Sequence, residues 1–248
     1  MIDTDLTNAI IFNNLDRFAL IAPRRMKIMC FSASASFTAG AVLTVAGVAT
    51  TKEVHKPSQR LFASIPFLFA IQQFAEGFVW IAFTQPDTFI SLKISTYAFL
   101  LFSDIVWPIM IPLSISLMEE NRKRKTILRI VVALGALLAL YYSCCLLIFP
   151  VNPQLVDCHI NYDGTFPKMF EIPAFLIYVT VTIVPLFVSS INRIRWLGVC
   201  MFLACVVSVV FYIQVVTSVW CFFAAILSGM IFWILRGNRP ASIREADA

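Results

Sequence analysis

Two acidic residues, Glu76 and Asp104, lie inside long apolar stretches of the sequence. An ionisable side chain in the middle of a membrane segment costs about 2.5–3.5 kcal/mol on insertion scales, so such a residue is a functional candidate by default. Gln72, Glu76 and Trp80 recur every four residues, and Gln73 stands beside them. On a helix this spacing predicts one polar face, which we expect to point into the protein.

A second polar position is followed closely by prolines. Asp104 is followed by Trp107 and Pro108, and Pro112 comes one turn later. A proline inside a helix leaves a backbone carbonyl without its donor, and in a membrane a cavity, water or a neighbouring helix must satisfy that carbonyl. We therefore expect a kink that opens space beside Asp104.

These residues predict a binding pocket for a small polar or cationic ligand, or for protons, used in transport or sensing. The acidic groups would supply counter-charge and the tryptophans aromatic walls. The candidate ligand-binding residues are Gln72, Gln73, Glu76, Trp80, Asp104, Trp107 and Gln214. Catalytic residues and a cofactor are not identified by any motif, and whether the protein is an enzyme stays open.

Two alternatives remain beside the binding pocket. In the first, Cys30, Glu76, Asp104 and His159 hold a metal, in a metal-binding protein or an intramembrane metal-dependent hydrolase. Only two histidines occur in the chain, and no H-E-x-x-H motif is present. In the second alternative the protein is structural, and Glu76 serves as an interhelical hydrogen-bonding group without any ligand.

The composition indicates what kind of structural elements position these residues. The chain has 248 residues, of which 60% are hydrophobic and 13% charged, and its mean hydropathy is +0.85. These values indicate an integral membrane protein whose first partner is the lipid bilayer. The net charge of +5 comes from basic clusters between apolar runs, which fits membrane orientation and argues against nucleic-acid binding.

Seven apolar segments reach or approach the roughly 20 residues that a membrane helix needs. We therefore predict an all-α membrane protein, an antiparallel bundle of seven transmembrane helices. Most connections are short, but residues 150–171 form a long loop, which we expect to cover the site. The segments are about 31–51, 61–83, 94–117, 127–149, 172–191, 196–215 and 218–235.

The basic residues predict how the bundle is oriented. With seven spans, most lysines and arginines fall in the loops of one side, and only Lys93 and Lys168 fall in the loops of the other. The positive-inside rule makes the basic side cytoplasmic, with the N-terminus outside. We expect a membrane domain at 29–236 and a cytoplasmic tail at 237–248.

Residues 1–28 do not follow this rule, because Arg17, Arg24, Arg25 and Lys27 precede the first span on the predicted outer side. We expect Met29, or else Met26, to be the functional start, with 1–28 an extension that is not native. The alternative is an interfacial amphipathic helix, since Ile11, Leu15, Phe18 and Ala22 share one face.

Four motifs in order, MCFSASASF, PFLFAIQQFAEGFVW, FSDIVWPIMIPL and CHINY, resemble a family of uncharacterised bacterial multi-spanning membrane proteins. Chains of this family open Met-Cys-Phe-Ser-Ala and carry a QQxxEGxxW segment in the second helix. The resemblance begins at Met29 and runs to the seventh helix. It implies a bacterial plasma membrane and a start at Met29, and it implies no activity.

The first span also carries small residues at helical spacing. Ser32, Ser36 and Gly40 recur every four residues and Gly47 follows seven later, which favours close helix packing over a catalytic serine array.

Three cysteines, Cys30, Cys158 and Cys221, map to the outer side. A disulfide among them is one alternative, and free thiols are the other.

Overall fold

A computed structural model describes residues 31–85, 91–156, 159–164, 166–212 and 215–237. Cys30, Cys158 and Gln214 lie outside these residues, as do the predicted extension at 1–28 and all of the tail but its first residue. The predictions made for them stay predictions.

The seven predicted spans are confirmed. The described residues hold seven helices, of 20 to 28 residues, that are long and apolar enough to cross a membrane. At about 1.5 Å per residue, each is at least as long as the hydrocarbon layer is thick. They comprise α2 (Ala33–Lys52); η1 (Pro57–Gln59), α3 (Arg60–Ala63) and α4 (Ile65–Thr84); α5 (Leu92–Leu100), η2 (Leu101–Val106) and α6 (Trp107–Met118); α7 (Arg122–Ile148); α8 (Lys168–Val188); α9 (Asn192–Tyr212); and α10 (Val216–Ser228) with α11 (Met230–Gly237).

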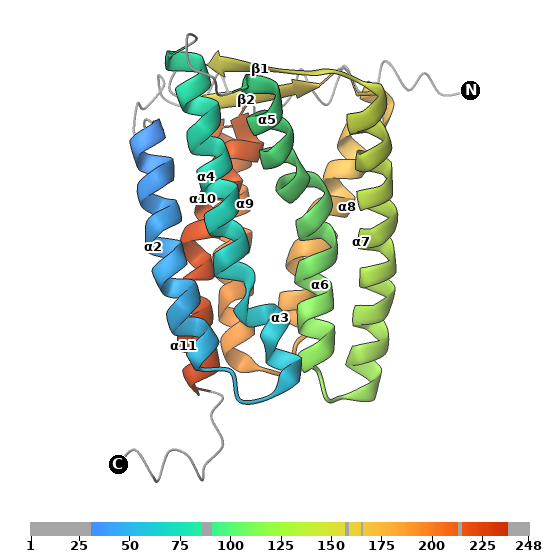
Figure 1. Ribbon diagram of the computed structural model, residues 1–248. Helices are drawn as coiled ribbons and strands as arrows, with labels where there is room; N and C mark the ends of the chain where they lie inside the picture. The colour runs from blue at the N-terminus through green and yellow to red at the C-terminus, as the bar shows by residue number, and fades with distance from the viewer. Residues whose placement is uncertain (1–30, 86–90, 157–158, 165, 213–214, 238–248) are drawn as a thin grey trace, which may run out of the picture.

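The helices alternate in direction, and the two ends of the bundle differ (Figure 1). The end at which α3 lies and α7 begins carries basic residues, among them Lys56 and Arg122. At the opposite end a hairpin of two strands, β1 (Val151–Val156) and β2 (His159–Gly164), lies across the helices. The sequence analysis expected only a loop here. The strands are antiparallel, with Val151 opposite Gly164 and Val156 opposite His159.

The small residues of the first span pack against α4, as predicted. A Cβ added at Gly40 would lie 2.8 Å from the ring of Phe74, and one added at Gly47 would lie 2.8 Å from the ring of Phe67. In return, a Cβ at Gly77 would lie 2.9 Å from the ring of Phe37. Aromatic rings of each helix therefore fill spaces that glycines leave on the other, which brings the two backbones close together.

The predicted distortion near Asp104 is a π-helical segment, η2, between α5 and α6. Pro108 and Pro112 cannot donate to the carbonyls of residues 104 and 108, four positions earlier. The freed carbonyl of Pro108 faces α7, where a Cβ added at Gly135 would lie 1.9 Å from the Pro108 oxygen. Only glycine fits at this crossing, so the kink and the glycine form one packing unit.

At the basic end, Glu119 ties two loops together. Its carboxylate accepts hydrogen bonds from the backbone N–H groups of Asn121, at 2.9 Å, and Ser190, at 2.8 Å. Arg124 donates to the backbone carbonyl of Ser189, at 3.0 Å. Burial alone would raise the pKa of Glu119, but the two N–H donors and the charge of Arg124 together lower it. The α6–α7 turn is thereby joined to the α8–α9 turn.

Candidate functional site

Glu76 lies on α4 and is almost completely buried, with 1% of its surface exposed. The Ser218 hydroxyl on α10 donates to Glu76 Oε1 at 2.5 Å, and Gln73 Nε2 donates to Oε2 at 3.4 Å. Both carboxyl oxygens thus accept a neutral donor, and the described residues supply no cation in a salt bridge with Glu76. The face predicted to point inward does so.

Gln72 connects the same face to α6. The indole N–H of Trp107 donates to Gln72 Oε1 at 2.7 Å, and Trp107 stacks on Phe69 with ring centroids 3.8 Å apart. The Gln72 amide also lies beside the Cys221 thiol of α10. One turn of α4 therefore contacts both α6 and α10 through polar groups.

The hairpin contributes Tyr162 to this cluster. Its ring stacks on Phe99, with centroids 4.5 Å apart and planes 13° from parallel, and its hydroxyl is buried. Burial, with smaller contributions from the nearby Glu76 and Cys221, raises the pKa of Tyr162 well above its ordinary value of 10.0. The phenol therefore keeps its proton at neutral pH and stays available as a hydrogen-bond donor next to Glu76.

Several buried polar atoms of the cluster have no hydrogen-bond partner among the described residues. They are Gln72 Nε2, Gln73 Oε1, Trp80 Nε1 and the Tyr162 hydroxyl. Buried polar groups in proteins nearly always have a partner, so each unpaired one needs an explanation such as water or a ligand. The set holds both donors and an acceptor. Together with Glu76, we call these four residues the Glu76 cluster.

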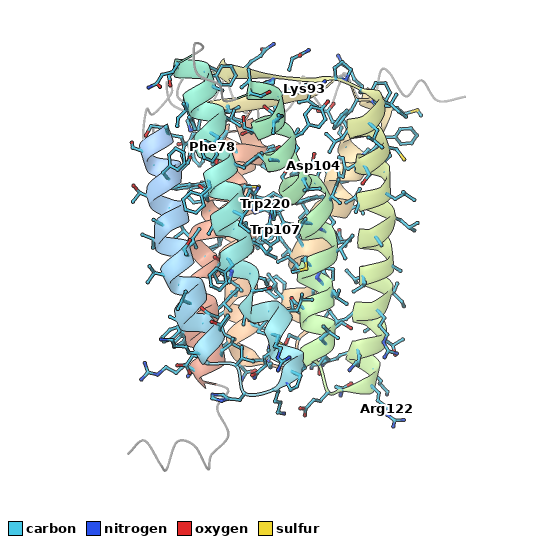
Figure 2. The ribbon with its side chains drawn as sticks, viewed as in Figure 1. Phe78, Lys93, Asp104, Trp107, Arg122 and Trp220 are labelled. Carbon is cyan, nitrogen blue, oxygen red and sulfur yellow. The ribbon has the colours of Figure 1, made fainter. Side chains whose placement is uncertain are left out.

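Asp104 makes no hydrogen bond with the Glu76 cluster among the described residues. It is half-buried in η2, where the Ser103 hydroxyl donates to Oδ1 at 2.7 Å. Tyr142 of α7 and Tyr178 of α8 are close enough to interact with it electrostatically. No hydrogen bond of the described residues joins Asp104 to Glu76. Figure 2 shows Asp104 nearer the hairpin end than Trp107 and Trp220, which lie midway along the bundle.

The candidate metal ligands do not form a cluster where they are described. His159 is buried beside the rings of Phe31 and Tyr212, whose centroids lie 5.0 and 5.1 Å from its own. In the part of the chain that the structure describes, no group of three or more histidine, cysteine, aspartate or glutamate residues could hold a metal ion. Cys30, the remaining candidate, lies outside that part.

Cys221 occupies a different place from the outer rim predicted for it. Its thiol is free and buried within the bundle, beside Gln72 and near both Glu76 and Asp104. The structure thus shows no disulfide at Cys221. The difference arises because the start of α10 contacts β2 of the hairpin, so that the stretch from Ser218 to Cys221 is already buried.

Two members of this site, Ser218 and Tyr162, were missed by the sequence analysis. Ser218 is the first residue of the seventh predicted span and Tyr162 lies in the CHINY motif, and neither was given a role. The sequence offered one signal for them: each is a polar residue in a short segment next to an apolar run. A serine and a tyrosine are too common for that signal to identify a partner of Glu76.

A family described as "Family of unknown function (DUF6629)" matches residues 29–246 of the chain. The match covers most of the chain, so the protein belongs to this family of unknown function. It confirms the resemblance to an uncharacterised family. No curated protein and no solved structure matches the chain.

Proposed function

We propose that the protein binds a proton or a small polar or cationic ligand at the Glu76 cluster and uses this binding for transport or sensing. The observation that carries the proposal is a carboxyl group 1% exposed, without a paired cation among the described residues, in a cluster with four buried polar atoms that have no hydrogen-bond partner among those residues. A group with this surrounding can take up and release a proton or accept a cation. Structural hydrogen bonding alone leaves the unpaired atoms unexplained.

The proposed route to Glu76 starts at the hairpin end. Tyr162 links the hairpin to the cluster, and Ile160, which is fully buried, packs with Val79 and Val219. A small movement of β2 would therefore change the surroundings of Glu76 directly. We further propose that this end faces the outside of a bacterial plasma membrane and that the basic end is cytoplasmic, with the chain's N-terminus outside.

The proton-transport form of the proposal is tested in proteoliposomes with an entrapped pH indicator and an imposed potassium diffusion potential. We expect Glu76→Gln to reduce proton flux to that of empty liposomes, because an amide carries no titratable proton. The glutamine can still accept the Ser218 hydrogen bond, so the variant should fold. The matched control is Glu171→Gln, a change at an exposed glutamate at the start of α8, which should keep the wild-type flux.

The ligand-binding form is tested by thermal unfolding of the purified protein with sodium or methylammonium chloride, against choline chloride as the ionic-strength control. A bound cation raises the midpoint Tm, since it binds only the folded state. We expect this rise in the wild type and in Glu171→Gln, and its loss in Glu76→Gln. The proposal is wrong when Glu76→Gln equals the wild type in both assays, or when the wild type shows neither effect.

A further inference from the structure

Two arginines, Arg193 and Arg236, come together at the basic end of the bundle from helices that run in opposite directions. Arg193 is the second residue of α9, and Arg236 is the second-last residue of α11. Figure 1 shows α11 ending at the end of the bundle opposite the hairpin. The Arg193 guanidinium lies against Gly237, where an added Cβ would clash with it, so Arg236 directly precedes the residue that Arg193 contacts.

Trp233 of α11 fixes the position of the Arg193 guanidinium. The guanidinium carbon lies 4.4 Å from the centroid of the Trp233 ring, and Nη1 donates to the Trp233 backbone carbonyl at 2.5 Å. This bond satisfies a carbonyl in the last turn of α11, where a positive charge is also favoured by the helix dipole. It uses one of the five N–H donors of the guanidinium, so the others remain for a second acceptor.

No carboxylate forms an ion pair with either arginine in the part of the chain that the structure describes. At the same end, Glu120 pairs with Lys56, and Glu119 accepts hydrogen bonds from two backbone N–H groups. Two positive charges brought together without a counter-charge attract an anion. The arginine side chain is well suited to phosphate, because its planar donors match the geometry of the phosphate oxygens.

The surroundings of the two arginines favour a lipid over a soluble anion. Trp233 is 46% exposed and lies one turn deeper in the bundle than Arg236, as aromatic residues do where a span meets the headgroup layer. Farther from this end, the exposed side chains of α9 and α10 are apolar, among them Val199, Phe202 and Ile226. A lipid with its phosphate at the arginines would therefore lay its hydrocarbon chains on an apolar surface.

We propose that Arg193, Arg236 and Trp233 form a binding site for the headgroup of an anionic phospholipid in the leaflet at the basic end. The two guanidinium groups donate to the phosphate oxygens, and the indole packs beside the glycerol backbone. A lipid with a net negative charge is preferred over phosphatidylcholine, whose choline would bring a third positive charge to the arginines. The site shares no residue with the Glu76 cluster, so either proposal can fail without the other.

The test is native mass spectrometry of the detergent-purified full chain with phosphatidylglycerol and phosphatidylcholine that have identical acyl chains. We expect the first bound phosphatidylglycerol to have a Kd about tenfold lower than the first bound phosphatidylcholine, a ratio that corresponds to one charge-assisted hydrogen bond. Inorganic phosphate at the same concentration should not displace it. Equal affinity for the two lipids overturns the proposal, and displacement by inorganic phosphate would show a soluble anion site instead.

Variants distinguish this site from general attraction between a basic surface and an anionic lipid. Arg193→Gln and Arg236→Gln should each weaken the binding of phosphatidylglycerol about tenfold and leave that of phosphatidylcholine unchanged. The matched control is Arg122→Gln, which removes the same charge from an exposed arginine at the start of α7, across the bundle from α11 in Figure 1, and should keep the wild-type preference.

The Arg236 variant keeps the test decisive if the loss of the α11 cap unfolds Arg193→Gln. Arg236 is exposed and takes part in no salt bridge of the described residues, so Arg236→Gln should fold. Wild-type affinity for phosphatidylglycerol in Arg236→Gln, or an equal loss of affinity in Arg122→Gln, overturns the proposal.

Discussion

At the scale of single residues, the amide of Gln72 shows how the polar face of α4 is held. Its oxygen accepts from Trp107 at 2.7 Å, while its nitrogen has no partner among the described residues. A buried amide with only one half satisfied is held in place by that single bond. Trp107 therefore orients this side chain, whose other half lies beside the Cys221 thiol.

We predict that Trp107→Phe lowers the free energy of unfolding by about 1–2 kcal/mol, because it leaves the buried Gln72 oxygen without a donor. The phenyl ring can still pack on Phe69. The measurement is denaturation of the purified protein in detergent, with Trp196→Phe as the control for loss of an indole. Equal stability of the two variants would show that the hydrogen bond contributes nothing.

The sequence could predict the residues of α4 but not their partners. The four-residue spacing of Gln72, Glu76 and Trp80 places them on one face whatever the rest of the chain does. Ser218 meets Glu76 only because α10 has a particular rotation about its own axis, and that rotation depends on packing across 142 positions of chain. Spacing within one helix carries no information about it.

At the scale of elements, the contact between α6 and α7 depends on one glycine. We predict that Gly135→Ala lowers the free energy of unfolding by about 3 kcal/mol, the upper end of the usual cost of overpacking, because its Cβ would lie 1.9 Å from the Pro108 oxygen. The measurement is thermal or denaturant unfolding in detergent. The control is Ala136→Ser, on the exposed side of the same helix, which should be close to neutral.

The two turns at the basic end give a pH prediction. The pKa of Glu119 is lower than its ordinary value of 4.5, so its contribution to stability is fully present above that value and is lost as the pH falls through the folded pKa. We expect wild-type stability to fall between pH 6 and pH 3 by more than that of Glu119→Gln. Unfolding midpoints across that range measure it.

The neighbouring glutamate is the control for this prediction. Glu120 has a side chain that is 82% exposed and forms a salt bridge of 2.9 Å with Lys56. Exposed ion pairs contribute little to stability, so Glu120→Gln should follow the wild-type pH dependence. A Glu119→Gln variant with the same pH dependence as Glu120→Gln would contradict the role given to Glu119.

The length and hydropathy of the apolar segments predicted the seven spans, but they predicted neither the hairpin nor η2. The thickness of a bilayer sets the length of a helix in advance. The strands β1 and β2 are only six residues each, contain Pro153 and Gly164, and pair mainly because they lie on the helix ends. The prolines indicated a distortion near Asp104, but which helical form relieves it depends on the neighbouring α7.

At the scale of the whole molecule, the two ends of the bundle predict an orientation that can be measured. We expect Gln154→Cys, exposed in β1, to react with a membrane-impermeant maleimide in intact cells, and Lys123→Cys, exposed at the basic end, to react only after lysis. The unsubstituted protein gives the background from its own cysteines. The reverse pattern would place the N-terminus in the cytoplasm.

A small apolar cavity, lined by Trp107, Trp220 and Ala224 among others, is a feature of the whole molecule that sequence could not predict. A cavity forms where the side chains of several helices do not reach one another. Its position depends on how each helix is rotated about its axis and on the angles at which the helices cross. Its lining residues, such as Ala224 and Leu197, have no unusual spacing or composition. The donor of Trp220 could be recognised as unpaired only once its surroundings were known.

The glycine contacts also determine where the bundle can come apart. Phe37, Phe67 and Phe74 interlock α2 with α4, and the carbonyl of Pro108 seats α6 against Gly135 of α7. Sliding within either pair would drive backbone or rings into each other, so we expect each pair to move as one unit. Under the proposed transport function, we expect a cycle that exposes Glu76 to separate one pair from the other and to release α10, whose Ser218 hydroxyl donates to Glu76.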